Sequence, residues 1–166
     1  MKLKFKKIPI VLALVVLILC IALEKRAIAD QLYIVASEST QKKSQTWYDF
    51  LEFKEIPFTL LLLDDFRDLK EEKYIVIMGG INELKDLRNL FKQVLTNNEL
   101  EWLTQKGNGN MYLKSDIWTQ GQKIIVFAGS DQSASTKARE VNKEEWLEMF
   151  SEWFDLEDDP DGMLPY

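Results

Sequence analysis

The chain has 166 residues, with 21 basic and 27 acidic side chains and a net charge of −6. A surface this acidic repels phosphate backbones, so we expect no nucleic-acid partner. Histidine is absent, and Cys20 is the only cysteine, which excludes histidine-based catalytic triads and the common zinc sites.

The first 29 residues predict a segment that enters the membrane. Four lysines precede an uncharged apolar run of 16 residues at positions 8–23, a pattern that holds the N-terminus in the cytoplasm. The run is shorter than the roughly 20 residues of a usual span, and Ala27-Ile28-Ala29 resembles a signal-peptidase site. The charged residues between them would instead mark the outer edge of an anchor. Residues 1–29 are therefore a signal peptide or an N-terminal membrane anchor, and in both cases Asp30 onward lies outside the cytoplasm.

The exported part is more acidic than the whole chain. Residues 1–29 contain six basic residues and one acidic residue, so the remainder has a net charge of −11. The single cysteine lies in the apolar run, and the domain must therefore be held together by core burial without a disulfide. Residues 30–154 are enough for one domain with one core.

The first half of this domain predicts three buried strands. Continuous apolar runs indicate strands at 31–36, 58–63 and 74–78. A helix is expected over 40–54, ending before Pro57 because the residue that precedes proline avoids helical geometry. The third strand ends in two glycines.

The second half predicts helices around one further buried strand. Asn82 is expected to cap a helix with leucines at helical spacing. A short helix over 98–105, an edge strand over 111–114 and a strong strand over 123–128 follow. Two further helices are expected, one from Ser133 or Ser135 to about Val141 and one after Asn142, and the acidic residues 155–166 form a flexible tail.

Strands that are apolar throughout, without alternation, are buried on both faces, which indicates a parallel sheet covered by helices. We therefore expect a single α/β domain after the export segment. Its sheet should be a small, open, mostly parallel one in a three-layer arrangement, flavodoxin-like or Rossmann-like.

Ligands of such sheets gather at the carboxyl ends of the strands. Three strand-to-helix turns would converge there and supply the candidate ligand-binding residues Ser37, Glu38, Gly79, Gly80, Asn82, Gly129, Ser130 and Asp131. The same residues suit ordinary strand-to-helix turns, and this alternative stays open. Neither a Gly-x-Gly-x-x-Gly motif nor a P-loop is present, and we expect no cofactor.

Two further features suggest possible contacts. Trp118, in the loop before the last strong strand, is a candidate partner contact, with packing over the sheet edge as the alternative. The acidic tail resembles a calcium loop when Glu157 is placed at its first position, but the required glutamate at position 12 would lie beyond Tyr166. We therefore expect no EF-hand and assign no metal ligands.

Three stretches resemble an α/β module of archaeal surface-layer and related cell-envelope proteins: Tyr74-Ile-Val-Ile-Met-Gly-Gly80, Trp118-x-x-Gly121, and Ile124 to Asp131 followed by Thr136-Lys-Ala138. The periplasmic subunit of bacterial cellulose synthase contains a similar module. The resemblance covers roughly residues 74–138. It implies a structural or interaction role at the cell surface, with no catalytic residues to carry over.

These observations favour a non-catalytic extracytoplasmic module of the cell envelope. Its partner would be an envelope protein or a polysaccharide, and an uncleaved N-terminal segment would add contact with the membrane. The alternative is an exported enzyme that uses carboxylates or a metal ion on a sugar or phosphate ester, with Glu38 and Asp131 as its acid–base pair. A transient adaptor, whose acidic tail recruits a basic partner, is a third hypothesis.

Overall fold

A computed structural model describes residues 30–66 and 70–156. The predicted export segment, residues 1–29, and residues 157–166 of the predicted tail, including the calcium-like stretch, lie outside this part. Among the described helices, none is long and apolar enough to cross a membrane.

The domain is built on a five-stranded, mostly parallel open sheet, which confirms the predicted α/β class. The strand order is β2-β1-β3-β5-β4. The first four strands are parallel, and β4 pairs antiparallel with β5. The strands are β1 (Leu32–Ala36), β2 (Phe58–Leu61), β3 (Tyr74–Gly80), β4 (Gly109–Ser115) and β5 (Lys123–Gly129).

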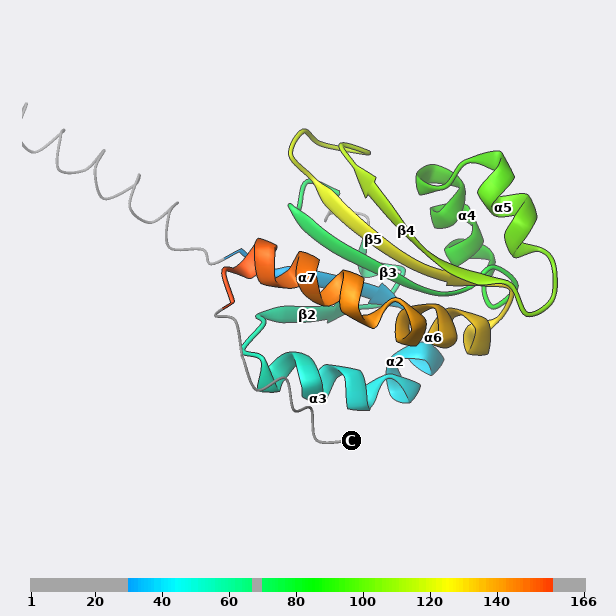
Figure 1. Ribbon diagram of the computed structural model, residues 1–166. Helices are drawn as coiled ribbons and strands as arrows, with labels where there is room; N and C mark the ends of the chain where they lie inside the picture. The colour runs from blue at the N-terminus through cyan, green and yellow to red at the C-terminus, as the bar shows by residue number, and fades with distance from the viewer. Residues whose placement is uncertain (1–29, 67–69, 157–166) are drawn as a thin grey trace, which may run out of the picture.

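Helices pack on both faces of this sheet (Figure 1). One face carries α2 (Glu38–Lys43), α3 (Gln45–Phe53), α6 (Gln132–Val141) and α7 (Lys143–Phe154), and the other carries α4 (Lys85–Val94) and α5 (Asn97–Leu103).

The central strand β3 explains why the sequence pattern is continuously apolar. All seven of its residues are buried. Val76 and Met78 join an aromatic cluster under α3 and α7, whereas Ile75 and Ile77 join the aliphatic cluster under α4 and α5. Because successive side chains point to opposite faces, a strand between two helical layers needs an apolar residue at every position.

Four sequence-based expectations differ from the structure. The buried strand predicted over 58–63 is the edge strand β2, which ends at Leu61 and has no fully buried residue. The helix predicted over 40–54 is two helices, since the N–H of Ser44 bonds to the carbonyl of Gln41 and ends α2 before α3 begins. The strand predicted over 111–114 is the longer β4. Asn82 does not cap α4: the N-cap position is Leu84, which makes no side-chain cap. The amide of Asn82 is instead engaged by the neighbouring turn, where it donates to the carbonyl oxygen of Ser130 at 3.1 Å.

Candidate functional site

The three predicted turns do meet at the carboxyl end of the sheet. β1 and β5 both pair with β3, so their ends lie on either side of Gly80. Gly80 is so close to the turn after β5 that a Cβ atom there would lie 2.5 Å from Cα of Asp131. The bond from Asn82 to Ser130 ties the same two turns together.

Several of the predicted residues make hydrogen bonds that hold these turns and helix starts. Ser37 Oγ accepts from the N–H of Thr40 at the start of α2, and Asp131 Oδ1 accepts from the N–H of Ala134 at the start of α6. The hydroxyl of Ser130 accepts from the N–H of Gly107 at 2.9 Å. Such caps satisfy donors that a helix start leaves open. A ligand role for these residues stays a prediction.

Glu83 is the residue at this edge that sequence reasoning missed. Its half-buried carboxylate lies between the ends of β1 and β3, where it accepts hydrogen bonds from Ser37 Oγ, from Thr40 Oγ1 at 3.0 Å and from the N–H of Gly80 at 3.1 Å. The strand order reverses between β1 and β3, because β2 lies beyond β1 and β5 beyond β3. This is the switch point at which ligands of open α/β sheets bind.

Gly79 makes room for this carboxylate. Its φ is 142°, a value that side-chain-bearing residues rarely adopt, and a Cβ there would lie 2.5 Å from Leu87 Cδ2 and 3.0 Å from Glu83 Oε2. The N–H and hydroxyl groups that a ligand anion would meet at the switch point are therefore already bonded to Glu83, a side chain of this protein. The sequence signal that could have located Glu83 was an acidic residue three positions after Gly80, the last residue of β3.

The proposed acid–base pair is not linked in the structure. Glu38 points to its own helix, where Lys42 Nζ lies 2.6 Å from Glu38 Oε1 and the two side chains are largely exposed. That hydrogen bond and the lysine charge lower the pKa of the Glu38 carboxyl. Asp131 instead faces the first turn of α6. Each carboxylate thus has a separate local partner.

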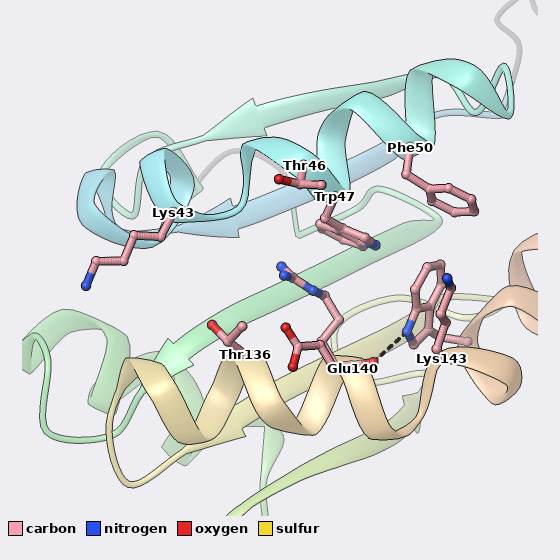
Figure 2. A pocket seen from close by; sticks show the side chains of 9 residues that line it. Lys43, Thr46, Trp47, Phe50, Thr136, Glu140 and Lys143 are labelled. Carbon is pink, nitrogen blue, oxygen red and sulfur yellow. Dashed lines mark hydrogen bonds between the residues drawn. The ribbon is translucent and has the colours of Figure 1, made fainter. Parts of the chain in front are cut away.

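A hollow of about 370 Å³ lies away from this edge, between α3 and the junction of α6 and α7 (Figure 2). Trp47 and Phe50 project into it from α3, and Thr136, Glu140 and Lys143 come from the opposite wall. Arg139 also lines it: Nη1 donates to Ser44 Oγ at 3.0 Å, and the guanidinium lies 4.9 Å from the Trp47 ring centroid.

Buried polar atoms accompany this hollow. Burial raises the pKa of Tyr48 to about 12, although the positive charge of Arg139 partly opposes this shift. Among the described residues, Trp47 Nε1 has no hydrogen-bond partner. That nitrogen is also closed to solvent, so a ligand could reach it only after the walls move.

Trp118 packs against the sheet on the side of α4. Its ring centroid lies 5.3 Å from that of Phe66, and Lys70 Nζ lies 5.3 Å from it on the ring face. The side chain is half-buried. A partner contact at Trp118 stays a prediction.

Within residues 30–66 and 70–156, no group of three acidic, histidine or cysteine side chains is placed to hold a metal ion. Comparison of the chain with protein-family models, with curated proteins and with solved structures gives no match.

Proposed function

We propose that the chain is a non-catalytic module of the cell envelope that lies outside the cytoplasm and binds a partner protein or an envelope polymer. The observation that carries the proposal is the Glu83 carboxylate at the switch point. It fills the position that a small-molecule anion takes in other open α/β sheets. We therefore expect the binding surface to lie on the outside of the domain.

The fold and the sequence pattern support the same proposal. The parallel strands run in the order β2-β1-β3-β5, which corresponds to the first four positions of the flavodoxin-like order. We assign the domain to that arrangement, with β4 as an added antiparallel edge. The resemblance to surface-layer modules and the N-terminal export pattern support a location at the cell surface, with the domain either released or held by residues 8–23.

Two measurements test the proposal. In intact spheroplasts that produce the full chain, added protease should digest the domain if residues 8–23 hold it, and the domain should appear in the medium if it is released, while a cytoplasmic marker survives. Recovery of undigested domain with the cytoplasmic fraction would contradict the location. Thermal melting of the full chain with monosaccharides, sugar phosphates, Mg²⁺ or Ca²⁺ should give no specific stabilisation. Stabilisation by one of these compounds that is lost in both Glu38→Gln and Asp131→Asn would favour the enzyme instead.

A further inference from the structure

The outer edge of β2 has backbone groups that are directed away from the sheet. Among the described residues, β2 pairs with β1 alone. The N–H of Leu32 donates to the carbonyl of Pro57 at 2.9 Å, and Leu32 is in register with Phe58. In a parallel ladder this register turns the peptide groups of Thr59 toward β1 and those of Phe58 and Leu60 outward.

This four-residue edge is short, but it lacks other features by which proteins protect a free strand. The run from Phe58 to Leu63 contains no charge and no proline. Leu60 is 37% exposed and Leu62, just beyond the strand, is 43% exposed. Natural edges are normally blocked by charged residues, proline or bulges, and an unprotected apolar edge is a template for a further strand.

The opposite edge of the sheet provides a comparison. β4 also has an exposed leucine, Leu113, at 46%. Its neighbour Lys114 places a charge on that strand, and the ammonium lies 2.7 Å from Glu99 Oε1 on α5. The contrast singles out β2 as the edge open to strand addition.

The charges at the ends of β2 indicate the kind of strand that would fit. Glu55 precedes the strand and Asp64 and Asp65 follow it, and all three are exposed. Two copies paired antiparallel about Leu60 would set Glu55 opposite Asp65, and like charges in that position are destabilising. A strand with lysine or arginine at its ends would instead meet opposite charges at both ends.

We propose that β2 is the docking edge for an extended segment of a partner protein, apolar in its centre and basic at its ends, which adds as a sixth strand. The main-chain bonds of Phe58 and Leu60 hold the segment, and the acidic ends of β2 select its charge. The proposal rests on the partner-binding function above and names the surface and the chemistry of the partner.

The test uses the full chain in detergent micelles and a fluorescent peptide of alternating valine and threonine with two lysines at each end. Binding followed by anisotropy should be saturable, and hydrogen exchange of residues 58–62 should slow on binding. Leu60→Pro removes one outward N–H and no bond to β1, so the fold should remain while affinity falls at least tenfold. Leu60→Lys should also weaken binding, whereas Leu113→Lys, the same change on β4, should leave affinity within twofold.

Several results would overturn the proposal. These are unchanged affinity in a folded Leu60→Pro variant, no slowing of exchange at residues 58–62, or equal binding of a peptide with glutamates in place of the lysines. A gain in affinity on deletion of residues 157–166 would show that the tail covers the edge. Dimerisation abolished by Leu60→Pro would assign the edge to a second copy. If the β2 docking test fails while the domain is still found outside the cytoplasm, only the β2 proposal is contradicted and the proposed envelope function is not.

Discussion

At the scale of single residues, Glu83 joins the ends of two strands. Its carboxylate connects the first turn of α2, through Ser37 and Thr40, to the N–H of Gly80 at the end of β3. Hydrogen bonds to a charged acceptor are stronger than neutral ones, and a donor left without its acceptor in a buried place is destabilising. The side chain therefore stabilises the switch point as well as filling it.

Replacing Glu83 tests this role. Glu83→Ala should lower the free energy of unfolding by about 2–4 kcal/mol, because it leaves several donors without an acceptor, and Glu83→Gln should lower it less. Urea unfolding of the full chain in detergent measures both. Glu101→Ala, on the exposed face of α5, is the control and should change stability by less than about 0.5 kcal/mol. Equal effects of Glu83→Ala and Glu101→Ala would show that the contacts of Glu83 contribute nothing.

Glu99 links α5 to the edge strand β4. Burial acts to raise the pKa of its carboxyl, but the hydrogen bonds from Lys114 and Thr96 together outweigh burial and hold the pKa below its usual value. The folded state therefore favours the ionised form of Glu99. Its contribution to stability is present above the unfolded pKa of about 4.3 and is lost as pH falls through the lower folded value.

This linkage predicts a pH-dependent difference between wild type and Glu99→Gln. At neutral pH the variant should be less stable by about 1 kcal/mol, and the difference should shrink as pH falls below about 4. Urea unfolding at a series of pH values measures it. In a Lys114→Met background the same comparison should depend less on pH. A difference that grows toward acid pH would reverse the assigned direction of the pKa shift.

At the scale of elements, the packing of α6 on the sheet depends on glycine. A Cβ on Gly129, the last residue of β5, would lie 2.7 Å from the carbonyl carbon of Ala134 and closer still to the backbone nitrogen of Ser135. These are backbone atoms of α6, so relief would require the helix to move. The close approach also lets Ser135 donate to the carbonyl of Phe127 at 2.6 Å.

Gly129→Ala should therefore destabilise the domain by about 2–3 kcal/mol or more, as overpacking does in a close-packed interior. Gly121→Ala is the matched control, because the added Cβ would meet open space although φ is 81°; its effect should be about 1 kcal/mol. Thermal unfolding followed by circular dichroism compares the two. A smaller loss for Gly129→Ala than for Gly121→Ala would contradict the close packing of α6.

Elements were predictable where one local cause decides them. The runs at β1, β3 and β5 are apolar because both of their faces are covered, and the sequence pattern reports this directly. The antiparallel pairing of β4 with β5 follows from their short connection, residues 116–122, because a parallel crossover needs about a dozen residues or more. Ser44, at the break between α2 and α3, also accepts a hydrogen bond from Arg139, and Asn82, before α4, donates to Ser130. Local helix signals do not report such tertiary contacts.

The location of the candidate site could be predicted from the sequence, but only some of its residues could. Glycines and polar residues after apolar strands located the carboxyl edge, because parallel strands end on the same side. That Glu83 turns back to Ser37, 46 positions earlier in the chain, follows from the pairing of β1 with β3 and could not be deduced from spacing. The prediction of Asn82 as a helix cap was wrong for a related reason. Its amide donates to Ser130 in the turn after β5, 48 positions later in the chain, and spacing does not reveal that contact.

At the scale of the whole molecule, an acidic domain presents three edges of different character. Residues 30–166 have a net charge of −11, which disfavours anionic ligands over most of the surface. The carboxyl edge is closed by its own anion, the β4 edge is charged, and the β2 edge is apolar between acidic ends. This distribution directs a basic, extended partner toward β2.

The central claim, that Glu83 occupies the ligand position of the fold, has a direct test by chemical rescue. Acetate should fit the space left in Glu83→Ala and accept the same donors. Sodium acetate, compared with sodium chloride at equal ionic strength and neutral pH, should raise the melting temperature of full-length Glu83→Ala by several degrees and leave wild type unchanged. Equal stabilisation of wild type and variant by acetate, or of neither, would contradict the claim.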